Sequence, residues 1–302
     1  MSDSTFDPKK FIDRESEQGL FEDLLRYETA ARILAIRDVG GMGKSHLLEK
    51  FQYRCRTVKP RIPISLVALD QLADYSPFSL VRMISEHLSA FGLQFENFAR
   101  YENARLTGNF SVISSSIYLQ ASNFAGASEV TIAGTIMKDI ATVNLGGSGI
   151  RLSPEQENTA REVVVGSFFD DLQKTCSTKP VVIIFDSYDK CDSGLKKWIT
   201  NHFLEKYFFS ATAESKLALI IAGQDLPPFK AKWPEEDCKR VVSSINELRR
   251  WKKRHVEKCL RVHGFTYEQP DLDAFYRLIE RGSPPSDVIQ LMHTYLPKKG
   301  TR

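Results

Sequence analysis

The chain is most constrained by a glycine-rich turn that stands between an apolar run and a helix-like pattern. Residues 31 to 50 read Ala-Arg-Ile-Leu-Ala-Ile-Arg-Asp-Val-Gly-Gly-Met-Gly-Lys-Ser-His-Leu-Leu-Glu-Lys. The apolar run predicts a buried strand, and the residues from Lys44 onward predict a helix. A buried strand that enters a helix through a short glycine loop is typical of a parallel α/β fold.

This turn also has the composition of a phosphate-binding loop, or P-loop. In such a loop the backbone N–H groups point at a polyphosphate, and the helix N-terminus adds partial positive charge. Lys44 would reach the β- and γ-phosphates, and the Ser45 hydroxyl would bind Mg²⁺. The residues that we expect to line a nucleotide site are Gly40, Gly41, Met42, Gly43, Lys44, Ser45 and His46.

One position departs from the P-loop pattern, which has glycine six residues before the lysine where this chain has Asp38. Aspartate tolerates unusual backbone angles better than most residues, but its carboxylate would weaken the binding of a polyphosphate. An ordinary glycine-rich turn from a strand to a helix is the alternative interpretation of the segment.

Length and composition set broad limits. The 302 residues are 42% hydrophobic, enough for a sizeable core, and the formal net charge of +3 does not by itself indicate nucleic acid or a membrane as partner. Five cysteines without Cys-x-x-Cys spacing predict reduced structural thiols. The N-terminus has no signal-peptide pattern, and no run of 18 apolar residues occurs, so we expect a soluble cytoplasmic protein.

Alternating strand and helix patterns follow the P-loop and predict a mostly parallel sheet between helices. We expect an entry segment and helix at 1–30, an α/β domain at 31–244 and a small helical lid domain at 245–302. One predicted strand directly precedes the glycine loop, and the others lie near 62–70, 179–186, 216–225 and 240–244. The predicted helices lie near 17–25, 44–56, 77–91, 155–175 and 194–208. Residues 107–150, rich in Ser, Thr, Gly and Ala, read as an insertion that serves either as a partner surface or as a mobile loop.

Polar residues end two of the predicted strands. Asp186 follows the run Lys-Pro-Val-Val-Ile-Ile-Phe, as in a Walker B strand, where a carboxylate at the ligand edge of a parallel sheet holds Mg²⁺ through water. Gln224 ends the strand after it, where an amide senses a γ-phosphate or orients water. A simple strand-end turn explains Gln224 almost as well.

Helical spacing continues to the end of the chain. Leu248, Trp251, His255, Cys259 and Val262 predict one helix over 247–263, and two more helices follow, separated by an elbow at Arg281-Gly-Ser-Pro-Pro285. These helices form the predicted lid.

The order of these motifs, from Phe11-Ile-Asp-Arg-Glu15 through the P-loop, Asp186 and Gln224 to Gly282-Ser-Pro284, resembles the STAND branch of the AAA+ ATPases. The resemblance implies that Phe11, Ile12 and Arg14 border the adenine and that Pro284 presses the lid on the nucleotide. It also implies a switch that holds ATP or ADP, forms homo-oligomers or joins other subunits, and triggers an effector, often in immunity, including bacterial antiviral defence.

The chain departs from that family at three positions. Asp13 and Asp38 stand where the family commonly has glycine, and Ser187 stands where an acidic residue usually follows the Walker B aspartate. Serine does not accept a proton from the attacking water as a carboxylate does, so hydrolysis should be slow or absent unless Asp189 substitutes. The sequence shows no effector motif, so we expect output on another chain or on a further part of this one.

Two other hypotheses remain open. Arg249, Arg250, Lys252, Lys253 and Arg254, with Lys258 and Arg261, form a basic run that fits a DNA-associated AAA+ loader or initiator. Such a run is also typical of a solvated helix face, and nucleic acid is the less favoured partner. The third hypothesis is a degenerate P-loop scaffold that binds nucleotide only for stability.

Overall fold

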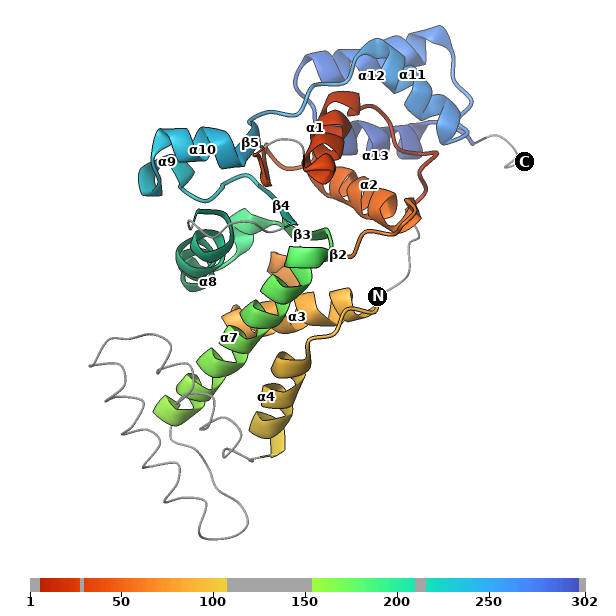
Figure 1. The fold of residues 1–302 in the computed structure, drawn as a ribbon. Helices are drawn as coiled ribbons and strands as arrows, with labels where there is room; N and C mark the ends of the chain where they lie inside the picture. Colours follow the sequence, from red (N-terminus) through yellow and green to blue (C-terminus); the bar gives the residue numbers. More distant parts are fainter. Residues whose placement is uncertain (1–5, 28–29, 108–153, 210–215, 299–302) are drawn as a thin grey trace, which may run out of the picture. The chain divides into compact units, whose positions relative to one another are not determined.

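The computed structural model describes residues 6–27, 30–107, 154–209 and 216–298, and it divides the chain into two compact units (Figure 1). Residues 1–75 and 180–302 make up the first unit, and residues 76–179 make up the second. The insertion expected at 107–150 lies outside the described residues, apart from Thr107. The expected boundaries after residues 30 and 244 stay a prediction.

A five-stranded parallel sheet forms the centre of the first unit. Its strands are β1 (Ile33–Arg37), β2 (Ile64–Ala68), β3 (Val181–Asp186), β4 (Leu217–Gly223) and β5 (Val242–Ile245), in the order β2-β3-β4-β1-β5. Every pairing is parallel, which confirms the predicted α/β class. The strands of such a sheet are apolar throughout because helices cover both faces, and all of β3 and β4 is buried.

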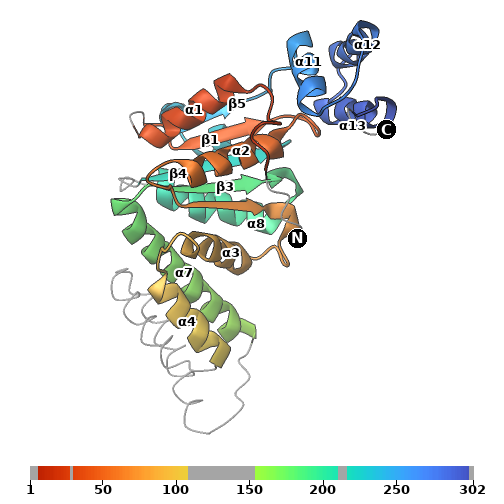
Figure 2. The same cartoon turned by 90° about the vertical axis from the view of Figure 1, so that its right-hand side faces the viewer.

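Helices lie on both faces of this sheet (Figure 2). On one face, α1 (Glu15–Arg26) packs on β1, and α2 (Lys44–Thr57) packs across β2, β3 and β4. On the other face, α8 (Ser193–Trp198) continues into the π-helix η3 (Ile199–Phe209), whose Phe203 meets Phe185 of β3 edge to face. Short helices η1 (Leu69–Gln71), η2 (Tyr188–Lys190), α9 (Phe229–Lys232) and α10 (Glu235–Val241) complete this region.

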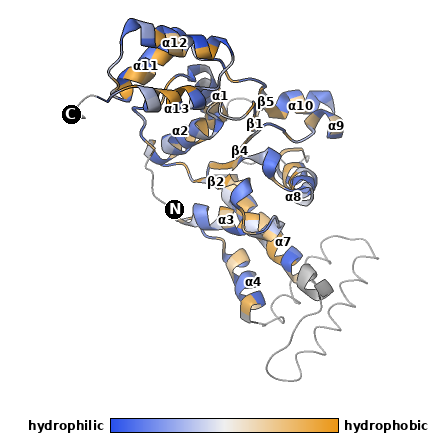
Figure 3. Cartoon of the chain, turned by 180° about the vertical axis from the view of Figure 1, so that it is seen from behind, coloured by the Kyte–Doolittle hydropathy of each residue, from blue (hydrophilic) through white to orange (hydrophobic). Residues whose placement is uncertain are grey.

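Three helices follow the sheet, namely α11 (Lys253–Val262), α12 (Gln269–Glu280) and α13 (Pro285–Tyr295). Each carries hydrophobic and hydrophilic residues (Figure 3), and their apolar side chains form a core of their own that also takes in Ile12 from the entry segment. The prediction of a single helix over 247–263 was wrong at its start. Lys252 is the N-cap of α11, and residues 246–252 form a separate linker segment.

The second unit is helical where it is described. It contains α3 (Pro77–Ser89), α4 (Glu96–Thr107) and α7 (Pro154–Thr178), of which α4 was not predicted from the sequence. Asp171 of α7 is buried and accepts hydrogen bonds from the side chain of Asn97 (2.8 Å) and the N–H of Phe98 (3.0 Å). A carboxylate on the first-turn N–H groups stabilises a helix start, so Asp171 fixes α4 against α7.

All five cysteines are free and buried. Burial raises the pKa of Cys55, Cys176 and Cys259 to about 12 and that of Cys191 to about 11, so these thiols stay protonated and unreactive near neutral pH. The prediction of reduced structural thiols agrees with this burial. None of the helices in the described ranges has both the length and the apolar character needed to cross a bilayer.

Candidate functional site

The P-loop leaves the sheet at the edge where all carboxyl ends meet. In the sheet register Arg37 of β1 pairs with Gly223 of β4, and Asp186 is the last residue of β3 on the other side of β4. Parallel sheets bind ligands at this edge. The sheet therefore places the loop and the Walker B carboxylate at the same edge, the carboxyl ends of the strands, with β4 between them.

The glycines of the loop adopt backbone angles that other residues reach only with strain. Gly41 has φ of +77° and Gly43 has φ of +91°. Gly43 is the N-cap of α2, which begins at Lys44, and no side chain caps this helix start in the described structure. The first N–H groups of α2 are therefore directed at the loop, where an anion would satisfy them.

Lys44 lies over the loop. Its Nζ donates to the carbonyls of Asp38 (2.6 Å) and Val39 (2.8 Å). Burial lowers its pKa, while the carboxylates of Asp38, Asp189 and Asp186 act in the opposite direction. A phosphate would offer this partly buried ammonium stronger, charged acceptors than two carbonyls.

The acidic side of the site is held by backbone contacts. Asp186 is 8% exposed and accepts from the N–H of Ser187 (2.8 Å), a residue with φ of +58°. Asp189 accepts from the N–H of Gln224 (2.8 Å) and so joins the ends of β3 and β4. The side-chain amide of Gln224 lies 3.9 Å from where a β-carbon on Gly40 would stand. Gln224 therefore borders the loop, and Asp189 has one oxygen in a structural bond.

In the described ranges, no three His, Cys, Asp or Glu side chains gather as a metal site made by protein alone would need. Mg²⁺ keeps several waters and binds through one or two carboxylates together with substrate phosphates. An exposed Ser45 at the start of α2 and Asp186 at the end of β3 fit that requirement.

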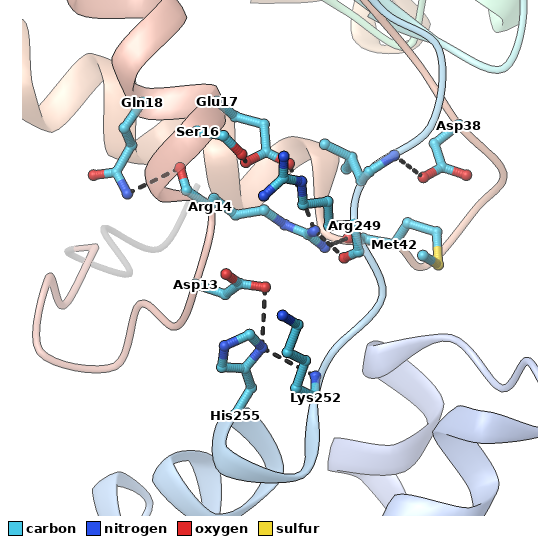
Figure 4. Close-up of polar contacts among 11 residues, drawn as sticks. Asp13, Arg14, Ser16, Glu17, Gln18, Asp38, Met42, Arg249, Lys252 and His255 are labelled. Carbon is cyan, nitrogen blue, oxygen red and sulfur yellow. Dashed lines mark hydrogen bonds and ion pairs between the residues drawn. The ribbon is translucent and has the colours of Figure 1, made fainter.

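The entry segment is attached to the loop through Arg14 (Figure 4). Arg14 is 4% exposed, lies 3.8 Å from a carboxylate oxygen of Glu17, and donates to the carbonyl oxygens of Met42 (2.8 Å) and Arg249. Both Asp13 (φ +69°) and Arg14 (φ +81°) are left-handed, which glycine adopts more easily than either residue. The position where the resemblance expects glycine is thus occupied by a strained aspartate.

The start of α13 rests on the loop from the other side. The N–H of Ser286 donates to the carbonyl of Gly41 (3.3 Å). A β-carbon added to Gly41 would stand 2.5 Å from Oγ of Ser286 and 2.8 Å from Cβ of Pro284. Glycine is therefore required at position 41 by sterics as well as by backbone angle.

A cavity of about 370 Å³ lies between these three elements. Its walls include an apolar group from the entry segment and α13, with Phe11, Ile12 and Ile289, and the loop residues Gly41, Met42 and Gly43. Of the expected site residues, those that line it are Phe11, Ile12, Arg14, Gly41, Met42, Gly43 and His46. Pro284 reaches the loop at Gly41, while Asp186, Asp189 and Gln224 lie at the carboxyl edge of the sheet and are not part of the wall of this cavity.

The role of the linker segment was not predicted from the sequence. Asp38 accepts from the N–H groups of Val39 (2.7 Å) and Leu248 (2.8 Å), so its carboxylate already has two donors. The aspartate at position 38, where the P-loop pattern has glycine, was the one sign of this contact in the sequence. Its partner Leu248, however, lies 210 residues away in the chain. The helical spacing of Leu248 and Trp251 pointed to a helix and concealed this contact.

Comparisons with known proteins add a fold likeness. No protein-family model matches the sequence, and no curated protein does. Similar solved structures include domain III of the replication initiation protein DnaA from Thermotoga maritima, at 12% identity and a TM-score of 0.40, over 91% of this chain and 81% of that one. Another is the ORC2 protein of Aeropyrum pernix in its ADPNP–ADP complexes, at 10% identity and a TM-score of 0.45, over 96% and 71%. The chain's own strand order, glycine loop and C-terminal helices define an α/β P-loop NTPase fold followed by a helical region.

Proposed function

We propose that the chain binds ATP or ADP with Mg²⁺ and acts as a nucleotide switch of the AAA+ superfamily, of the STAND type. The observation that carries the proposal is the cavity bordered at once by the entry segment, the P-loop and the start of α13. These are the three elements that the resemblance assigns to base, phosphates and lid. An apolar cavity with a few convergent polar groups is the usual form of a small-molecule site.

Each group in the proposed site has a distinct task. Phe11 and Ile12 would cover the base, since the cavity wall is apolar there. Backbone N–H groups of the loop and Lys44 would neutralise the phosphates. Ser45 and Asp186 would hold Mg²⁺, the second of them through water.

Hydrolysis by this site should be slow. Ser187 follows Asp186 and has no group that takes a proton from water near neutral pH. Asp189, the nearest substitute in sequence, has one carboxylate oxygen bonded to the N–H of Gln224. Slow hydrolysis would let the protein keep its nucleotide bound, as a molecular switch does. The proposal that this switch works within an oligomeric signalling or defence assembly is supported by the sequence resemblance.

The test is a calorimetric titration of ADP and of ATP, each with Mg²⁺, into wild-type and Lys44→Ala protein. Because charge-assisted hydrogen bonds contribute about 1.5–3 kcal/mol each, we expect the affinity of the variant to fall about 10- to 100-fold. Lys239→Ala is the matched control, because Lys239 is an exposed lysine on α10 that pairs with Glu235 (2.8 Å). Equal affinities in wild type and Lys44→Ala would remove the P-loop assignment.

A second candidate is a DNA-associated ATPase, and one observation favours it. All seven cations of the basic run between Arg249 and Arg261 are exposed. Three of them already face carboxylates of the chain, in the pairs Lys253–Asp273, Arg261–Glu257 and Arg250–Glu247. DNA binding that weakens steeply with salt, and that is lost on charge reversal at Arg249 and Lys252, would favour this candidate over the protein switch.

A further inference from the structure

The linker segment, residues 246–252, is held on the P-loop by side chains (Figure 4). Leu248 is fully buried, and its N–H donates to Oδ2 of Asp38 at 2.8 Å. The carbonyl of Arg249 accepts from the guanidinium of Arg14, which also donates to the carbonyl of Met42 at 2.8 Å. Two consecutive linker residues are thus fixed to the loop from two directions.

Asp38 makes four contacts that join different parts of the site. Its two carboxylate oxygens accept from the N–H groups of Val39 and Leu248. Its own N–H donates to the carbonyl of Gly223 in β4 (3.2 Å), and its carbonyl accepts from Nζ of Lys44 (2.6 Å). A glycine at this position would keep the two backbone contacts and lose both contacts of the side chain. The carboxylate is therefore what connects residue 38 to the linker.

A phosphate in the loop would change the surroundings of this carboxylate. It would bring negative charge near Asp38, and like charges repel more strongly in a partly buried site than in water. It would also draw Lys44 away from the Asp38 carbonyl, because a charged acceptor binds an ammonium more tightly. Both effects leave the N–H groups of Val39 and Leu248 as the donors that stabilise the Asp38 charge.

We infer that Asp38 is a positioning residue that couples phosphate in the P-loop to the linker segment, and through the linker to α11. The inference rests on the proposed nucleotide binding. Coupling of this kind is reciprocal, so the bond from Leu248 to Asp38 changes nucleotide affinity by the same factor by which the nucleotide changes that bond. The aspartate that interrupts the glycine pattern is thus part of the response to the ligand.

The experiment compares wild type with Asp38→Ala and with the nearly isosteric Asp38→Asn, which keeps one acceptor oxygen and the fold. Hydrogen exchange of peptides covering 246–252 is followed without nucleotide, with Mg·ADP and with a non-hydrolysable Mg·ATP analogue, beside calorimetric affinities. Asp225→Asn is the matched control, since Asp225 also lies just after a strand, β4, and its carboxylate accepts from the N–H of the next residue, Leu226 (2.9 Å).

Without nucleotide, we expect linker exchange about tenfold faster in Asp38→Ala, from the loss of one hydrogen bond, and an intermediate rate in Asp38→Asn. Nucleotide should change linker exchange in wild type and Asp225→Asn and have a much smaller effect in both Asp38 variants. If Asp38→Asn binds nucleotide and its linker responds as in wild type, the coupling is overturned and the proposed function stands. Tighter binding by Asp38→Ala with unchanged linker exchange overturns it too, because Asp38 would then only repel phosphate. Absence of binding in wild type overturns the proposed function itself.

Discussion

At the scale of single residues, His255 fixes the point where the linker becomes a helix. Its Nδ1 lies 3.1 Å from the N–H of Lys252 and 3.1 Å from Oδ2 of Asp13, and its Nε2 accepts from Nε of Arg254 at 3.0 Å. A neutral imidazole has one N–H and one acceptor nitrogen, so it serves two of these three neighbours at a time. A protonated ring carries an N–H on both nitrogens. It could donate to the Asp13 carboxylate, but it could no longer accept a hydrogen bond from Lys252 or from Arg254.

This arrangement gives a pH dependence of stability. Burial lowers the pKa of His255 below its usual value of about 6.5, and this outweighs the opposite effect of Asp13. The unfolded chain then binds more protons than the folded one as pH falls below about 6.5, so the stabilisation present above that pH is lost on acidification. We expect a lower free energy of unfolding at pH 5.5 than at pH 7.5.

Urea unfolding at the two pH values measures this effect. His255→Gln should reduce the difference between them, although His263, whose pKa burial also lowers, retains part of it. His202→Gln, at an exposed position, is the control, and we expect it to show the same difference in unfolding free energy between the two pH values as wild type. A wild-type stability equal at both pH values would show that neither histidine is held neutral by folding.

The candidate site was predictable from the sequence where its residues are neighbours in the chain. Gly41, Gly43 and Lys44 lie within one turn, and the local chemistry of that turn is legible without a structure. The contacts of Asp38 with Leu248 and of Arg14 with Arg249 join positions more than 200 residues apart. No spacing rule within a segment encodes such pairs, because they depend on how the linker returns to the loop.

At the scale of elements, the helical spacing of apolar residues predicted a helix correctly only where those residues are also packed as one face of a helix. Leu248 and Trp251 are buried, as a helix face would be, but their backbone is part of the linker, and α11 begins at Lys253. The apolar pattern of α4 is weak, because its buried positions Phe98 and Ala104 stand among charged neighbours and show no clear helical period. Its start depends instead on Asp171 from another helix.

The contact between the start of α13 and the P-loop can be tested by comparing two glycines of the loop, Gly41 and Gly43. Alanine at either Gly41 or Gly43 bears the cost of a left-handed backbone, about 1–2 kcal/mol. Only at Gly41 would the new methyl group also meet Ser286 and Pro284, since nothing lies within 4 Å of a β-carbon at Gly43. Overpacking of this kind costs about 1–3 kcal/mol more.

We therefore expect Gly41→Ala to destabilise the nucleotide-free protein more than Gly43→Ala, as measured by urea unfolding. Hydrogen exchange at residues 283–287 should rise in the first variant and stay near the wild-type rate in the second. Equal effects of the two substitutions on both measurements would mean that α13 does not rest on the loop in solution.

At the scale of the whole molecule, three short stretches of the first unit connect the sheet to the C-terminal helices. The entry segment contributes Ile12 to the core of α11, α12 and α13. The linker is bonded to Asp38 and Arg14, and the start of α13 is bonded to Gly41. All three stretches touch the P-loop or its neighbours, so we expect a ligand in the loop to act on these three connections between the sheet and the helices.

In a switch built in this way, the position or stability of the C-terminal helices should differ between nucleotide states. A ligand shifts such an equilibrium only by its difference in affinity for the two states, and the γ-phosphate is the group that distinguishes ATP from ADP. We expect hydrogen exchange across residues 245–296 to differ between Mg·ADP and a non-hydrolysable Mg·ATP analogue. Described helices of the second unit, such as α4, serve as the internal reference and should exchange alike in both. Identical exchange across 245–296 in the two complexes, with both nucleotides bound, would make the chain a static P-loop scaffold.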